Sequence, residues 1–143
     1  MRYLLDTATW ANGLTIPTVL PVRIRALLEN DPENKGLCSV SLIECATHHR
    51  RGRLNFAGPL SEFFALGLAR NIELLELTAE IAVAGNDLPR DFEGDPFDRA
   101  IAATARVLEL TLITADRNIR DAKGPDGHPF CRVEFYPFRP SRL

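Results

Sequence analysis

Several features are scarce in this chain of 143 residues, and each scarcity excludes a class of protein. Its three cysteines, Cys38, Cys45 and Cys131, are widely spaced and form no CxxC pair, which excludes a disulfide-stapled scaffold and favours a reducing cytoplasm. No apolar run approaches the roughly 18 residues of a membrane-spanning helix. Asp6 also interrupts the apolar stretch that a secretory signal needs. We therefore expect a cytoplasmic protein with no membrane segment.

Positive charge is not in excess, and it comes almost entirely from arginine. There are 17 basic and 19 acidic residues, which excludes the cationic coat of a general nucleic-acid-binding protein. Lys35 and Lys123 are the only lysines. The planar guanidinium group suits phosphate and carboxylate partners, but GC-rich codon usage explains the same bias. The hydrophobic content of 45% and the length fit one folded domain over residues 1–143.

Strand and helix patterns alternate along the chain. Strands that alternate with helices predict parallel pairing through βαβ crossovers, with helices on both faces of the sheet. We therefore expect an α/β fold with a central, mainly parallel sheet. Strands are expected at residues 2–5, 36–40, 71–77, 111–114 and 133–136. Helices are expected at 22–30, from Ser41 toward the basic residues 48–53, at 60–69, after Thr78, and from 96 to about 108, with an exposed turn-rich loop at 123–129.

Four acidic residues lie at functionally important ends of these elements. Asp6 follows the first predicted strand, and Asp116 follows the fourth. Glu44 and Asp98 lie in the first turns of two predicted helices. Ligands bind outside the carboxyl ends of the strands in an open parallel sheet, so all four side chains can meet at one edge.

Each acid also has a purely structural explanation. Segment 41–44 has a capping-box sequence, in which Glu44 would accept a hydrogen bond from a free backbone N–H. Segment 95–98 has an N-cap aspartate, a proline at the first helical position and an acid that the helix dipole favours. Asp6 and Asp116 can cap the segments that follow their strands.

The combination of four acids favours a metal site. Two like charges at 4 Å repel by roughly 1 kcal/mol in water and about 4 kcal/mol at an effective dielectric of 20. Protonation or a cation relieves such repulsion. Oxygen ligands alone suit Mg²⁺ or Mn²⁺, and such an ion can activate water to attack a phosphodiester. The pattern therefore predicts a polyanionic substrate.

Four segments together resemble the PIN domain family, and most closely the toxin ribonucleases of VapBC-type toxin–antitoxin modules. They are LLDT at 4–7, SVSLIECA at 39–46, GDPFDRAIAATA at 94–105 and LITADRNI at 112–119. The resemblance implies a three-layer α/β/α fold, Mg²⁺- or Mn²⁺-dependent cleavage of RNA, a homodimer, and inhibition by a cognate VapB-like antitoxin.

The resemblance also implies roles for individual residues. Asp95 acts as the helix cap, and the hydroxyls of Thr7 and Thr114 support the metal ligands from behind, although both also suit ordinary turn or strand positions. The catalytic and metal-binding acids carried over from the family pattern are Asp6, Glu44, Asp98 and Asp116.

Five arginines are candidates for contacts with RNA phosphates. The first three follow the helix that carries Glu44, where they also suit a solvated helix end. The other two follow Asp116. They are Arg50, Arg51, Arg53, Arg117 and Arg120.

Other functions fit part of this pattern. A phosphatase of the haloacid-dehalogenase type would use Asp6 as a nucleophile, but it needs a second aspartate two residues later, where this chain has Ala8. A non-catalytic module could bind an arginine-rich partner in the acidic pocket. A PIN nuclease could also act on DNA or in RNA processing instead of as a toxin. Metal-dependent turnover of RNA separates catalysis from binding alone.

Overall fold

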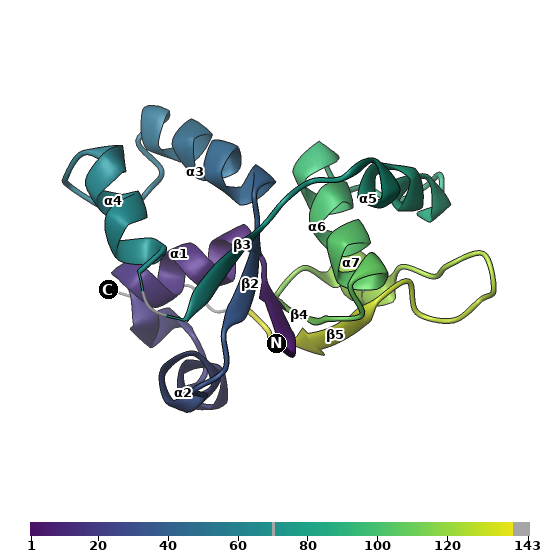
Figure 1. Ribbon diagram of the computed structural model, residues 1–143, viewed down its shortest axis with the longest axis horizontal. Helices are drawn as coiled ribbons and strands as arrows, with labels where there is room; N and C mark the ends of the chain where they lie inside the picture. The colour runs from purple at the N-terminus through teal and green to yellow at the C-terminus, as the bar shows by residue number, and fades with distance from the viewer. Residues whose placement is uncertain (70, 139–143) are drawn as a thin grey trace.

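A five-stranded sheet runs through the centre of the computed structural model, which describes residues 1–69 and 71–138 (Figure 1). The strand order is β3-β2-β1-β4-β5, and every neighbouring pair is parallel. This confirms the expected parallel sheet. The strands are β1 (Tyr3–Leu5), β2 (Lys35–Cys38), β3 (Ile72–Leu75), β4 (Thr111–Thr114) and β5 (Arg132–Phe135).

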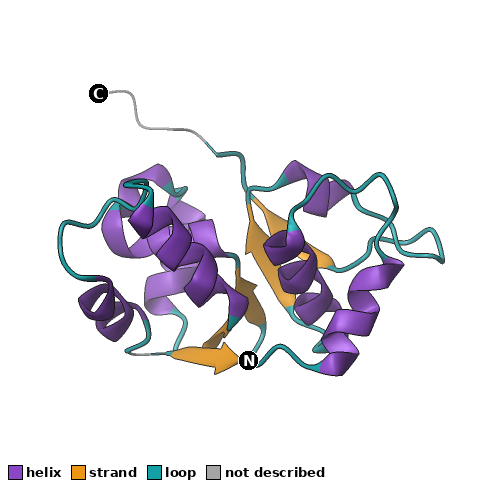
Figure 2. Ribbon diagram, turned by 90° about the horizontal axis from the view of Figure 1, so that it is seen from above, coloured by secondary structure: helices purple, strands orange, loops and turns teal. Residues whose placement is uncertain are grey.

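Helices cover both faces of the sheet and complete the expected three layers (Figures 1 and 2). One layer contains α1 to α4, and the other contains α5 to α7. No helix within 1–69 and 71–138 is long and apolar enough to cross a membrane. The helices are α1 (Thr7–Thr15), α2 (Val22–Asn30), α3 (Val40–Arg50), α4 (Leu60–Gly67), α5 (Ala79–Ala84), α6 (Pro96–Val107) and α7 (Arg117–Asp121).

The two faces of the sheet separate two hydrophobic cores. Neighbouring residues of a strand point to opposite faces, so each central strand contributes to both cores. Leu5 and Ile113 pack among α1 to α4, whereas Leu4 and Leu112 pack against Ile101 of α6. All five side chains are almost completely buried. Packing against the sheet therefore fixes the position of each helical layer, and with it the side chains that the helices carry at the carboxyl edge.

Two helices were not expected from the sequence. Helix α1 contains Thr, Asn and Gly, which are weak helix formers, and α7 has only five residues. Both begin directly after an aspartate that closely follows a strand. The side chains of Asp6 and Asp116 accept hydrogen bonds from backbone N–H groups of these helices and thereby cap them. The structural explanation of both acids is thus confirmed, together with their positions at the edge of the sheet.

Phe63 on α4 lies at the centre of the larger aromatic cluster. Its side chain is 1% exposed, and its ring centre lies 5.3 Å from that of Trp10 in an edge-to-face arrangement. Phe63→Ala would leave a cavity, so we expect the free energy of unfolding to fall by about 3–5 kcal/mol. Urea unfolding followed by Trp10 fluorescence measures the loss. On the same helix Leu66 is 61% exposed, and Leu66→Ala should change stability by less than about 0.5 kcal/mol. Equal losses in the two variants would contradict this description of the core.

Candidate functional site

A pocket of about 390 Å³ opens at the carboxyl edge of the sheet. Asp6 and Asp116 line it from the ends of β1 and β4. Glu44 of α3 and Asp98 of α6 line it from the two helical layers. The structure therefore brings together all four acids that the sequence placed at this edge.

Thr114, the last residue of β4, holds the two strand-end aspartates in place. Its hydroxyl donates to Asp6 Oδ2 at 2.5 Å, and its Oγ1 atom accepts the backbone N–H of Asp116 at 3.0 Å. The other oxygen of Asp6 accepts the Thr9 N–H at 2.7 Å. Thr114 thus fixes the side chain of Asp6 and the backbone of Asp116.

Glu44 lies in the second turn of α3, because this helix begins at Val40 and not at Ser41. The expected capping box between Ser41 and Glu44 is wrong. Ser41 is buried inside the helix, and its Oγ accepts a hydrogen bond from the Thr7 hydroxyl at 2.8 Å. Glu44 Oε1 is buried without a hydrogen-bond partner among the described residues. Such an oxygen is costly to leave unpaired, and a cation is a partner that fits it.

Helix α6 begins with the predicted aspartate cap. Asp95 Oδ1 accepts the Asp98 N–H at 2.9 Å, and Asp98 Oδ2 accepts the Asp95 N–H at 3.3 Å. One carboxylate oxygen from each of Glu44, Asp95 and Asp98 lies within 4.8 Å of the others. The sequence prediction treated Asp95 only as a cap. Its three-residue spacing from Asp98 places both carboxylates on one helical turn, and this spacing was the available signal.

The environment of the pocket disfavours negative charge. Burial is the main cause that raises the pKa of Asp6 and of Glu44 above the ordinary values. The pKa of Asp98 rises to about 7, mainly through burial and then through the charges of Asp95 and Asp116. No lysine or arginine is among the described residues that line the pocket. A hard cation bound by carboxylate oxygens would offset the negative charge of the acids and favour their ionised forms.

Tyr136 and Phe138 also line the pocket, and sequence analysis missed both. The Tyr136 hydroxyl lies 2.8 Å from Thr9 Oγ1, and burial raises its pKa to about 12, so it stays protonated. Phe138 is 52% exposed. Tyr136 follows β5 as Asp6 follows β1, and this strand-end position is the signal that could have identified it.

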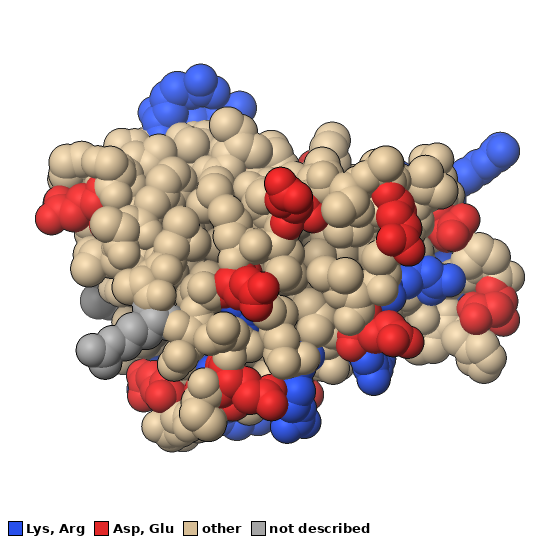
Figure 3. Space-filling model, in the orientation of Figure 1, with Lys and Arg blue, Asp and Glu red and all other residues tan. Residues whose placement is uncertain are grey.

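The five arginines predicted to contact RNA are not among the residues that line this pocket. The arginines of residues 50–53 are exposed at the end of α3, where Figure 3 shows basic side chains projecting from the surface. Arg117 is exposed at the start of α7. Arg120 Nε lies 2.8 Å from Asp121 Oδ1, and its guanidinium lies 4.4 Å from the ring centre of Phe135. Their contacts with RNA stay a prediction.

Thr114→Val should weaken metal binding without changing the shape of the side chain. The substitution removes both hydrogen bonds that orient Asp6 and Asp116, and loss of such supporting partners typically costs about 10–100-fold in metal affinity. It also raises the pKa of Asp6 further, because the Thr114 hydroxyl stabilises the charged carboxylate. Calorimetric titration with Mn²⁺ at neutral pH measures the effect. Thr114→Ser keeps the hydroxyl and should bind Mn²⁺ nearly as well as the original chain. Unchanged affinity in the valine variant would remove Thr114 from this role.

Comparisons with known proteins give consistent matches. The family model of the PIN domain matches residues 3–125. Ribonuclease VapC22 from Mycobacterium tuberculosis is 32% identical over 89 residues, which cover 62% of this chain and 68% of that protein. The DNA-bound VapBC structure from Salmonella typhimurium has a TM-score of 0.68 at 18% identity, covering 94% of this chain and 98% of that chain. VapBC2 from Rickettsia felis, bound to a DNA fragment from its promoter, has a TM-score of 0.66 at 17% identity with the same coverage. At these identities the two structures establish the fold alone.

Proposed function

This chain belongs to the PIN domain family, and on that premise we propose that it is a metal-dependent endoribonuclease that hydrolyses RNA phosphodiester bonds. The observation that carries the proposal is the pocket in which acids from both helical layers and two strand ends meet. The relative VapC22 is a ribonuclease, and its similarity supports RNA as the substrate.

We propose Mg²⁺ or Mn²⁺ as the cofactor, held by Asp6, Glu44, Asp98 and Asp116, with Asp95 beside them. Three observations support this fit: all the donors are carboxylate oxygens, Glu44 Oε1 has no partner among the described residues, and burial raises the pKa values of Asp6, Glu44 and Asp98, so a cation would favour their ionised forms. A bound ion of this kind lowers the pKa of water and offsets charge on phosphate oxygens.

The side chains of the pocket position the reacting groups. Thr114 holds Asp6 and Asp116 on one side, and the cap of α6 holds Asp98 on the other. Because no arginine or lysine is among the described lining residues, the pocket itself offers no positive side chain to an RNA phosphate. Cleavage should therefore depend strictly on the added cation.

We further propose that the chain is the toxin of a toxin–antitoxin pair. The solved structures that share its fold include VapBC complexes, which supports a VapB-like antitoxin as partner. We propose a homodimer as the assembly on the family resemblance alone. An arginine of the partner could place its guanidinium group among the carboxylates of the acid pocket and thereby block the pocket. We propose that the RNA backbone outside the pocket is contacted by five exposed arginines, Arg50, Arg51, Arg53, Arg117 and Arg120. The cytoplasm is the compartment that fits an RNA substrate.

Cleavage of a panel of structured RNAs tests the function. Purified protein free of any partner is incubated with each RNA in Mg²⁺, in Mn²⁺ or in EDTA, with Asp6→Ala prepared in parallel as a control for contaminating nucleases. We expect cutting only with the metals and only by the original chain. Folded protein that binds an arginine-rich peptide but cuts no RNA would favour the non-catalytic binding module instead.

A further inference from the structure

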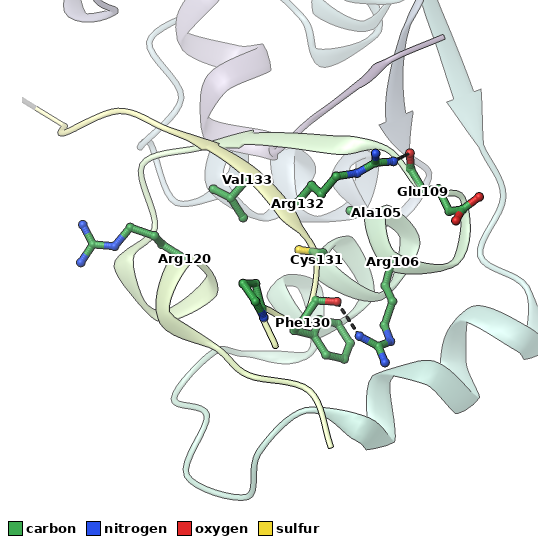
Figure 4. A pocket seen from close by; sticks show the side chains of 9 residues that line it. Ala105, Arg106, Glu109, Arg120, Phe130, Cys131, Arg132 and Val133 are labelled. Carbon is green, nitrogen blue, oxygen red and sulfur yellow. Dashed lines mark hydrogen bonds between the residues drawn. The ribbon is translucent and has the colours of Figure 1, made fainter. Parts of the chain in front are cut away.

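A second and larger pocket, of about 580 Å³, lies between the end of α6 and the start of β5 (Figure 4). Arg106 of α6 and Arg132 of β5 line it from different elements. It shares no lining residue with the acid pocket. Strand β5 is at the edge of the sheet, so this pocket lies along an outer border of the molecule.

The two guanidinium groups have uncharged partners. Arg106 Nη1 donates to the Phe130 carbonyl oxygen at 2.7 Å, and its guanidinium lies 4.8 Å from the Phe130 ring centre. Arg132 Nη2 donates to the carbonyl oxygen of Glu109. Among the ion pairs of residues 1–69 and 71–138, none includes Arg106 or Arg132. Each guanidinium has five N–H donors, so most of them stay available to an anion.

The other groups of the pocket do not cancel this charge. Figure 4 shows the carboxylate of Glu109 directed away from both guanidinium groups. Arg120 projects outward in the same view and pairs with Asp121. Burial raises the pKa of the Cys131 thiol to about 11, so this side chain stays neutral. Asp126 comes near Arg106 beside Gly124 without forming an ion pair with it, and it offsets part of this charge. The lining residues include three arginines and one glutamate, so the pocket keeps a net positive charge in a protein whose net charge is -2.

We propose that Arg106 and Arg132 bind phosphates of the RNA backbone at a distance from the bond that is cleaved, a role that rests on the proposed ribonuclease function. The planar guanidinium matches the geometry of phosphate oxygens. Arg132, the first residue of β5, and Tyr136 of the acid pocket are four positions apart in the sequence, at roughly 3.3 Å for each step along a strand. A strand of RNA held at the acid pocket therefore reaches the second pocket within a few nucleotides.

Binding of a short fluorescent oligo(U) in EDTA tests this proposal without cleavage and without a known target, because phosphate contacts are independent of sequence. The double variant Arg106→Gln/Arg132→Gln should bind about tenfold more weakly at low salt. The slope of log affinity against log salt should shrink by about 1.4, since each phosphate contact on a single strand contributes about 0.7. Arg2→Gln/Arg90→Gln removes two exposed charges elsewhere and should change affinity by less than about threefold.

A second variant keeps the test decisive if loss of the Arg106 contact with Phe130 impairs folding. Arg106→Lys/Arg132→Lys retains both charges, so it should retain the salt slope and lose affinity only through the missing planar geometry. Circular dichroism confirms that each variant is folded.

The proposal would be overturned by equal binding of the folded glutamine variant, by an equal loss in the Arg2/Arg90 control, or by displacement of oligo(U) by polyglutamate as readily as by unlabelled oligo(U). The last outcome would indicate an acidic protein segment as the occupant. Inorganic phosphate alone, added as a competitor, should displace oligo(U) only weakly, because it lacks the linked charges; efficient displacement would assign the pocket to free phosphate. If the original chain cleaves no RNA in Mg²⁺ but the glutamine variant still binds oligo(U) more weakly than the original chain, the ribonuclease function is rejected and Arg106 and Arg132 remain an RNA-binding site.

Discussion

Asp98→Asn should reduce RNA cleavage by about a hundredfold or more, since even the loss of outer partners of metal ligands costs about 10–100-fold. The same substitution should make the metal-free protein more stable at pH 8. The pKa of Asp98 is about 7, so its carboxylate is charged at pH 8 although burial and the charges of Asp95 and Asp116 disfavour that charge. Asparagine removes this unfavourable charge. Asparagine keeps an oxygen that can accept the Asp95 N–H and preserves the cap of α6.

Parallel assays of cleavage and urea unfolding measure both effects. The matched control is Asp87→Asn, which removes an exposed carboxylate that does not line the acid pocket. It should cleave RNA at the original rate. If Asp98→Asn also cleaves at the original rate, Asp98 does not belong to the site. A stability loss at pH 8 would show that its contact with Asp95 outweighs the repulsion.

The free energy of unfolding of the metal-free protein should fall as the pH rises from about 5 to about 8. A carboxyl group whose pKa is raised by folding binds its proton more tightly in the folded chain. Its contribution is therefore complete below the ordinary pKa of 3.8 and is lost as the pH passes through about 7. Allowing for the partial exposure of Asp98, we expect a decrease of about 2 kcal/mol from this group. Asp6 and Glu44 act in the same direction.

Addition of Mg²⁺ should abolish this decrease in the free energy of unfolding. The cation favours the ionised carboxylates, and it binds to the folded chain and not to the unfolded one. Urea unfolding between pH 5 and 8, in EDTA and in Mg²⁺, measures the difference. Cleavage should disappear in EDTA over the same range and return with Mg²⁺ or Mn²⁺. Asp98→Asn serves as the control for the pH effect, since it should make the decrease in EDTA smaller and leave only the part that Asp6 and Glu44 contribute. A curve in EDTA that rises toward pH 8 would mean that the pocket tolerates its charges without a cation.

The positions of the four acids could be predicted because simple rules determine them. Asp6 and Asp116 end parallel strands, and the carboxyl ends of such strands meet at one edge. Asp98 follows an aspartate and a proline that start a helix. The local pattern around Glu44 was misleading, because it predicted that Ser41 caps a helix. The Ser41 hydroxyl instead accepts a hydrogen bond from Thr7, which is 34 residues away in the chain.

The remaining features depend on contacts that no local pattern encodes. Helix α1 has weak intrinsic helix formers, and the buried ring of Trp10 holds it against Phe63 and Phe64 of α4. Arg106 and Arg132 are on α6 and β5, and only the packing of these elements places both on one pocket. Tyr136 reaches the acid pocket because β5 pairs with β4 in a specific register. Each of these positions is a result of tertiary structure.

The order of the strands has a consequence for the chain as it is synthesised. Strand β1 leaves the ribosome first, but its neighbour β4 in the sheet begins at Thr111, and the intervening segment forms β2 and β3 on the other side. Asp6 therefore cannot meet Asp116 at the edge of the sheet until β4 has been translated. A nascent polypeptide carries only part of the acid pocket, so a cell that makes this protein is exposed to its proposed activity only after β4 and Asp116 have been translated. Premature termination before β4 yields a fragment without that activity.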